Sequence, residues 1–133
     1  MSLNPVRNME AMSQPVLSEG LVFGKCGMTD IDLSCDWQGR TFVFVELKYG
    51  NTPLTRGQQY HLEGLVNAIN AGGKKAVALF ASHDTPKGEG IEARNATVKR
   101  IYQGRKFGWS EAKDLDLLET MTILHSEHIA RGK

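Results

Sequence analysis

The sequence of 133 residues contains only two cysteines and no long apolar run. Cys26 and Cys35 form no CxxC motif. We therefore expect free thiols in a reducing, cytoplasmic environment rather than a disulfide or a metal pair. No stretch approaches the ~20 apolar residues that cross a bilayer, which predicts that the chain has no membrane span. Residues 1–15 are largely polar and carry no recognisable secretory signal.

The chain also lacks a marked excess of one charge, since 16 Lys and Arg residues oppose 15 Asp and Glu residues. This balance argues neither for nor against a polyanionic partner. Near the C-terminal third, basic residues alternate with aromatic ones, an arrangement that can grip phosphates and stack bases. A solvated strand with a tryptophan packed in the core gives the same pattern. The candidate DNA-binding residues are Lys99, Arg100, Arg105 and Lys106.

Residues 1–18 contain Pro5 and Pro15 and no clean hydrophobic period. We interpret them as a loose N-terminal arm. The chain as a whole is 41% hydrophobic and 23% charged, an ordinary globular composition. Residues 19–133 are long enough to bury one core, so they are expected to form a single domain.

Alternating hydrophobic residues predict three strands in the first half of this domain, over residues 21–25, 30–36 and 41–48. A short connection that contains Gly39 separates the second strand from the third. Such a connection is typical of a hairpin, so the three strands are expected to form an antiparallel meander.

A helix is predicted over residues 55–70, with Thr55 as its N-cap and Gly72-Gly73 at its end. Its apolar stripe consists of Leu62, Leu65, Val66 and Ile69. Residues 75–81 are almost continuously apolar, which is typical of a strand buried on both faces. We expect this strand to run parallel to residues 41–48, with the helix as the crossover.

Residues 92–103 predict a further strand, and residues 110–130 predict a second helix with Ser110 as its N-cap. The expected inner face of that helix consists of Leu115, Leu118, Met121 and Thr122. His125 and His128 share a face of the helix, but no third ligand lies at a suitable spacing, so no zinc site is predicted. The order βββαββα indicates an α/β fold, a mixed β-sheet with flanking helices.

Charged residues stand at the end of the predicted strand 41–48, where Glu46 and Lys48 are two residues apart and therefore share one face. If this strand pairs with residues 30–36 through the hairpin, Asp32 lies close to Glu46. Two carboxylates at close range repel each other unless a cation neutralises them, and Mg²⁺ prefers oxygen ligands of this kind. An ion-pair cluster at a sheet edge is the structural alternative. A more remote one takes Asp30-x-Asp32 as the metal-binding motif of a sugar-nucleotide transferase.

Gln58 falls at the start of the predicted helix, which returns it towards the end of the strand 41–48. There its amide can hold an attacking water or a phosphate oxygen. Thr55-x-x-Gln58 also matches a capping box, in which the two side chains satisfy each other's backbone donors. The two roles are compatible.

At this point the chain resembles the PD-(D/E)xK nuclease superfamily, most closely its VRR-NUC-like or phage-type members. The resemblance covers residues 28–82 and rests on Asp32, on Glu46-x-Lys48 and on Leu54-Thr55-x-x-Gln58. It implies a restriction-endonuclease-like core and a Mg²⁺-dependent endonuclease acting on DNA, with Mn²⁺ able to substitute. It further implies that Asp32, Glu46 and the backbone carbonyl of Leu47 bind the metal, with Lys48 as the catalytic lysine.

Two features depart from the family pattern. Ile31 stands where a proline is usual before the aspartate, which leaves Asp30 as a second candidate ligand. The family often adds a glutamate from an N-terminal helix, and only Glu10 and Glu19 are available here. The alternative function is therefore a nuclease-fold DNA-binding module with little or no activity. The arm and the last helix are candidate surfaces for a homodimer.

Overall fold

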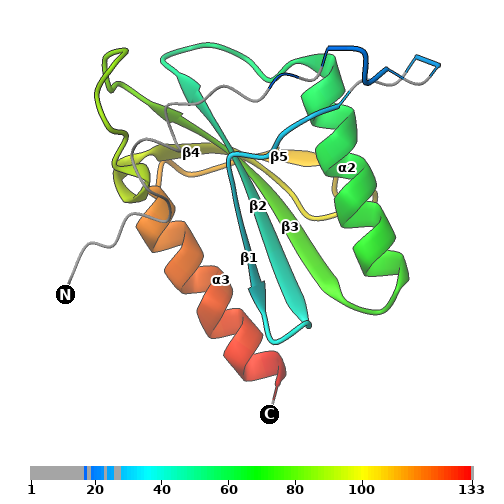
Figure 1. The fold of residues 1–133 in the computed structure, drawn as a ribbon. Helices are drawn as coiled ribbons and strands as arrows, with labels where there is room; N and C mark the ends of the chain where they lie inside the picture. Colours follow the sequence, from blue (N-terminus) through cyan, green and yellow to red (C-terminus); the bar gives the residue numbers. More distant parts are fainter. Residues whose placement is uncertain (1–16, 18, 23, 26–27, 133) are drawn as a thin grey trace.

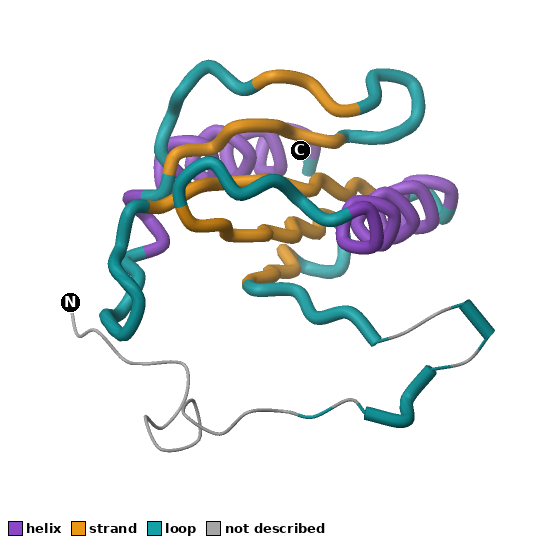
Figure 2. The backbone as a smooth tube through the Cα atoms, turned by 90° about the horizontal axis from the view of Figure 1, so that it is seen from above, coloured by secondary structure: helices purple, strands orange, loops and turns teal. Residues whose placement is uncertain are grey.

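The computed structural model describes residues 17, 19–22, 24–25 and 28–132. They form a five-stranded sheet in the order β1-β2-β3-β4-β5, with one long helix on each face (Figure 1). Seen from above, the strands lie in one stack between the two helices (Figure 2). The elements are β1 (Leu33–Trp37), β2 (Thr41–Tyr49), α2 (Arg56–Ala71), β3 (Lys75–His83), η1 (Ala93–Asn95), β4 (Thr97–Tyr102), β5 (Trp109–Glu111) and α3 (Leu117–Arg131).

The sheet is mixed, as predicted. β1 and β2 pair antiparallel, while β2 and β3 pair in parallel through the α2 crossover. β4 and β5 then extend the sheet in antiparallel fashion. Thr55 caps α2 and Gly72 ends it, which confirms the boundaries expected from the sequence. β3 has six consecutive buried residues, because helices cover both of its faces.

Alternate residues of β2 face opposite helices. Val43 and Val45 belong to the core cluster on the side of α3, and Leu47 packs against it. Phe42 and Phe44 instead pack with Leu62 of α2. Side chains of a strand alternate between faces, so Glu46 and Lys48, the next even-numbered residues of β2, also point to the α2 side.

The N-terminal part of the predicted meander is wrong. Leu21 and Val22 lie outside any strand and are 44% and 62% exposed, and residues 24–25 form a turn. The arm predicted over residues 1–18 lies outside the described residues except for Leu17. None of the helices in the described part of the chain is long and apolar enough to span a membrane. Cys35 is a free thiol, as expected; Cys26 lies outside the described residues.

The predicted start and inner face of the C-terminal helix are also wrong in part. Ser110 does not cap a helix but lies in β5, where it pairs with Ile101. α3 begins later and is capped by Asp116, which forms a capping box with Glu119. The buried face of α3 also differs from the expected one, because packing against the sheet selects another stripe of residues. Leu118, expected inside, is 53% exposed, while the buried residues of α3 are Leu117, Thr120 and His128.

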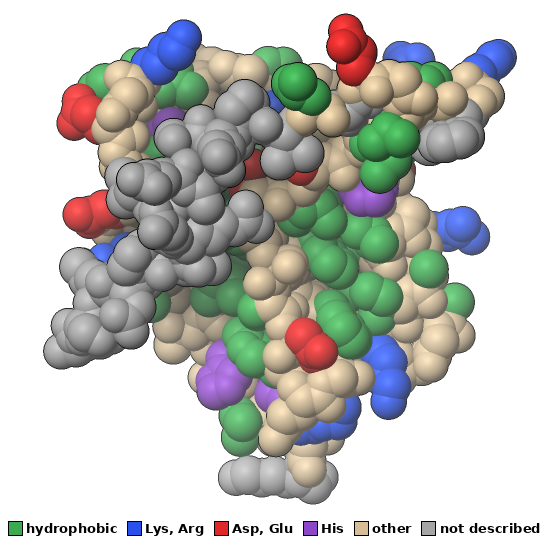
Figure 3. All heavy atoms as spheres, in the orientation of Figure 1, with side chains coloured by type: hydrophobic (Ala, Val, Ile, Leu, Met, Phe, Trp, Pro, Cys, Tyr) green, Lys and Arg blue, Asp and Glu red, His purple; other side chains and the backbone are tan. Residues whose placement is uncertain are grey.

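His128 links the end of α3 to the β1–β2 hairpin through a chain of hydrogen bonds. Arg131 Nη2 donates to Thr41 Oγ1 at 3.0 Å, and the same hydroxyl oxygen lies 2.7 Å from His128 Nδ1. His128 Nε2 lies 3.1 Å from Gln38 Oε1 and 3.2 Å from Arg40 Nη2. Histidine and basic side chains gather at this end of the molecule (Figure 3). The contacts hold His128 as a buried neutral ring.

Replacing His128 should remove a pH dependence of stability. Burial, followed by the charges of Arg40, Arg131 and His125, lowers the pKa of His128 below its ordinary 6.5. The unfolded chain therefore binds the proton more readily, so stability is full above about pH 6.5 and falls as the pH drops below it. We expect His128→Gln to lower the melting temperature at pH 7.5 by roughly 5–10 °C. The change in melting temperature between pH 7.5 and 5.5 should also become smaller in this variant.

The exposed His61 of α2 provides the matched control, since His61→Gln removes one imidazole without touching the hairpin. Differential scanning calorimetry of the wild type, His128→Gln and His61→Gln between pH 7.5 and 5.5 measures the melting temperatures. Equal pH profiles for His128→Gln and the wild type would contradict the neutral, buried assignment.

Candidate active site

The predicted acidic site lies where β2 ends. Glu46 is the buried acid of the sheet, with only 3% of its surface exposed. The register of β1 and β2 ends with Leu33 opposite Val45. One step further along the same register places Asp32 opposite Glu46. The hairpin therefore brings together two carboxylates that are separated in the sequence.

The backbone of Leu47 completes this end of the sheet. Its N–H donates to Asp32 Oδ2 at 2.7 Å, which fixes the carboxylate beside β2. The N–H and C=O of one strand residue face the same edge, because paired residues of an antiparallel ladder exchange both bonds. The Leu47 carbonyl thus faces the edge that carries Asp32, beyond the last register pair of β1.

Gln58 forms the predicted capping box with Thr55. Its backbone N–H donates to Thr55 Oγ1, and its side-chain Oε1 accepts from the backbone N–H of Thr55, each at 3.1 Å. The remaining amide nitrogen, Nε2, donates to Glu46 Oε1 at 3.1 Å. The capping box therefore orients Gln58 towards Glu46, and the first turn of α2 becomes one wall of the site.

Electrostatics at the site disfavour the ionised state of Glu46. The pKa of Glu46 is raised from its ordinary 4.5 to about 7, first by burial and then by the charge of Asp32 and a hydrogen bond with it. Lys48 acts in the opposite direction, and Asp30 adds a smaller upward effect. The net shift is upward, so Lys48 does not neutralise Glu46 as a partner in a simple ion pair would. The pair therefore favours a proton on Glu46, and a cation bound between the two side chains would favour the ionised form instead.

The predicted accessory acids differ in their relation to this site. Asp30 is exposed, yet its charge acts on Glu46. Glu19 is exposed and is not among the charges that shift Glu46, and Glu10 lies outside the described residues. Within residues 17–132 as far as they are described, no group of three or more His, Cys, Asp or Glu side chains is placed to hold a metal ion.

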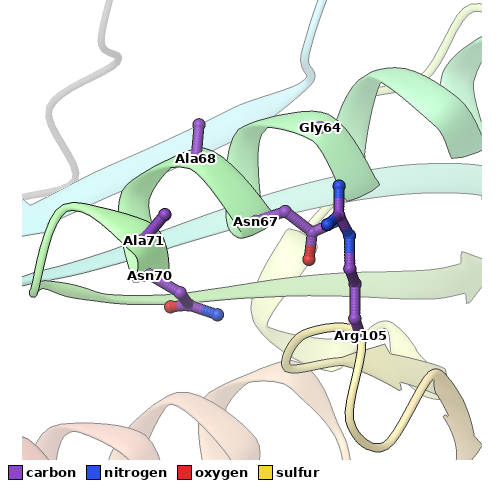
Figure 4. Close-up of a pocket in the computed structure, with 6 residues that line it drawn as sticks. All are labelled: Gly64, Asn67, Ala68, Asn70, Ala71 and Arg105. Carbon is purple, nitrogen blue, oxygen red and sulfur yellow. The ribbon is translucent and has the colours of Figure 1, made fainter.

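The four predicted DNA-binding residues do not form one cluster. Arg100 is half-buried on β4, and the exposed Lys99 precedes it. Arg105 and Lys106 lie in the exposed turn that follows. Arg105 extends from this turn towards Asn67 of α2, at a pocket of about 520 Å³ (Figure 4). This pocket lies along the second half of α2, whereas Gln58 and the acids lie at the first turn.

The parallel pairing adds two neighbours that the sequence did not single out. Phe80 lies opposite Glu46, and Ser82 lies opposite Lys48. Phe80 is 9% exposed, so it contributes an apolar neighbour that favours a protonated Glu46. The sequence did contain a signal for these two neighbours. It predicted two parallel strands joined by a helix, and parallel strands end at the same edge of a sheet.

Comparisons with protein-family models, with curated proteins and with solved structures find no match to this chain.

Proposed function

We propose that the protein is a Mg²⁺-dependent endonuclease that hydrolyses DNA phosphodiester bonds at the end of β2. The observation that carries the proposal is the convergence of Asp32, Glu46 and Gln58 beside Lys48. Two neighbouring carboxylates, one of them buried, fit the oxygen-rich ligand set of Mg²⁺. When bound there, the ion supplies charge stabilisation and a more acidic water.

Each side chain has a distinct task in this proposal. Asp32 and Glu46 hold the metal, together with the backbone carbonyl of Leu47. Lys48 emerges on the same face as Glu46 and places a compact positive charge where the scissile phosphate gains negative charge. Gln58 is already oriented by its capping box, and its amide holds the attacking water or a phosphate oxygen.

The architecture supports the same proposal. The resemblance to PD-(D/E)xK nucleases implies three strands, a helix and a further strand, and β1, β2, α2 and β3 supply all of these except the first strand, in this order. We therefore propose that these four elements form a restriction-endonuclease-like core, to which β4, β5 and α3 are added.

Metal-dependent nicking tests the proposal. Supercoiled plasmid and branched or flap DNA should be cleaved in MgCl₂ or MnCl₂ and remain intact in EDTA. Asp32→Asn should reduce the rate at least about 100-fold, since it removes a ligand charge. Its amide oxygen still accepts from the Leu47 N–H, so the fold is retained.

Asp114→Asn is the matched control for Asp32→Asn. Asp114 is exposed and has a positive φ of 58°, which asparagine tolerates well. The cleavage activity of Asp114→Asn should equal that of the wild type. Intact DNA of all three forms with every metal, or full activity of Asp32→Asn, would overturn the endonuclease proposal.

A DNA-binding module without chemistry is the second candidate. The observation that favours it is the absence, among the described residues, of a third acidic or histidine side chain in a metal cluster. Salt-dependent binding of DNA with no cleavage in either metal would support this alternative.

A further inference from the structure

Arg100 lies in the same transverse row of the sheet as Glu46. Glu46 pairs with Phe80 on β3, and Phe80 pairs with Arg100 on β4. Directly paired residues of neighbouring strands point to the same face, so Arg100 emerges on the α2 side, as Glu46 does. With strands about 4.8 Å apart, the two backbones are separated by about 10 Å.

A β-bulge adjoins Arg100. The register of β3 and β4 shifts between Phe80 and Ala81, so that Ala81 pairs with Val98 and Lys99 is the extra residue. Bulges re-aim side chains and occur often beside active sites. In a regular strand, residues two apart share a face. Here the bulge places Val98 on the α3 side with Ala81, while Arg100 pairs with Phe80 on the α2 side.

Trp109 fixes the guanidinium of Arg100. The carbon Cζ of Arg100 lies 5.0 Å from the centre of the Trp109 ring, a cation–π contact. The indole Nε1 donates to Glu63 Oε2 of α2 at 2.7 Å, so the ring is anchored to the helix that also carries Gln58. A planar guanidinium held in this way loses little freedom when it binds a phosphate with two hydrogen bonds.

We infer that Arg100 is a phosphate-positioning residue of the proposed nuclease site, holding a phosphate of the DNA strand whose scissile bond lies at Glu46 and Lys48. The inference rests on the proposed function and deepens it. Charges along one strand of a duplex recur every ~3.4 Å of helix axis, so this phosphate lies within about three nucleotides of the scissile one. Arg105, at the other half of α2, is not part of this contact.

Binding of a labelled oligonucleotide in EDTA, followed by fluorescence anisotropy, tests the inference apart from cleavage. Arg100→Gln should weaken binding about 10-fold at low salt and reduce the salt slope by about 1, whereas Arg100→Lys should recover part of the loss. Lys74→Gln is the matched control, because it removes an exposed cation directly before β3, at the end of the sheet away from Glu46, and it should change affinity by less than about 3-fold. Melting temperatures establish that all variants fold.

The outcomes separate the two hypotheses. If cleavage depends on metal but Arg100→Gln and Lys74→Gln bind alike, the inference is wrong and the endonuclease proposal stands. If no metal supports cleavage but only Arg100→Gln weakens binding, the endonuclease proposal fails and Arg100 remains a DNA contact. Glu111 is the other neighbour of Arg100 in the register, so a loss of melting temperature in Arg100→Gln with unchanged binding would assign Arg100 a structural role instead. Absence of DNA binding by the wild type overturns the inference.

Discussion

Glu46→Gln should abolish metal-dependent cleavage and at the same time stabilise the protein at pH 8. The first effect follows from the loss of a ligand charge, which we expect to reduce the rate at least about 100-fold. The second follows from burial, because the ionised carboxylate is 3% exposed and lies beside Asp32. The neutral amide of the variant still accepts the hydrogen bond from Gln58.

The raised pKa of Glu46 sets the direction in which stability changes with pH. The pKa of Glu46 is about 7 in the folded protein, against an ordinary value of 4.5. The folded state therefore binds more protons between these values, and its stability rises as the pH falls from above 7 towards 4.5. At pH 8 the ionised group destabilises the wild type by about 1–2 kcal/mol, once solvent screening at the open strand end is allowed for.

Thermal melts without metal at pH 8 and pH 5 measure this cost. Glu46→Gln should melt about 3–8 °C above the wild type at pH 8 and close to it at pH 5. Added Mg²⁺ should raise the melting temperature of the wild type only, because the ion binds the ionised carboxylate of the folded state. Glu89→Gln, in the exposed loop after β3, should change none of these values. Equal melting temperatures of Glu46→Gln and the wild type at pH 8 would contradict the account.

The central part of the fold was predictable because local and tertiary signals agree there. Alternating residues over β2, the capped and amphipathic α2 and the apolar β3 each match their period, and short connections leave few ways to join them. The same agreement placed Asp32 and Glu46 together, since a short hairpin sets their register. The proximity of these two carboxylates could therefore be predicted from the sequence.

The two ends of the domain were not predictable in the same way. The apolar run Leu21-Val22 resembles a strand, but a strand needs a partner for its backbone groups, and these residues lie outside the sheet. Ser110 is an acceptable N-cap in isolation. Pairing with β4 uses its backbone instead, which is a tertiary effect. The capping box of Asp116 and Glu119 was visible in the sequence and marks the true start of α3.

Lys48→Met should reduce the rate of DNA cleavage about 10²–10³-fold while Mg²⁺ still binds. The variant keeps the apolar stem of the side chain and removes only the ammonium group. Losses of this size are typical when one group that stabilises transition-state charge is removed. Since Asp32, Glu46 and the Leu47 carbonyl remain, the Mg²⁺-dependent rise in melting temperature should persist. Lys113→Met, at an exposed position before α3, serves as the control for the loss of one positive charge.

The pH profile decides how Lys48 acts. The charge of Lys48 lowers the pKa of Glu46, so its removal raises that pKa and shifts metal binding to higher pH. If this were the only effect, Lys48→Met would regain wild-type cleavage rates at pH 9, where Glu46 is ionised in both proteins. We expect the rate to remain at least about 100-fold low at pH 9 with saturating Mg²⁺, because the missing charge acts on the phosphate itself. Full recovery at pH 9 would make Lys48 a residue that tunes Glu46 rather than one that acts on the substrate.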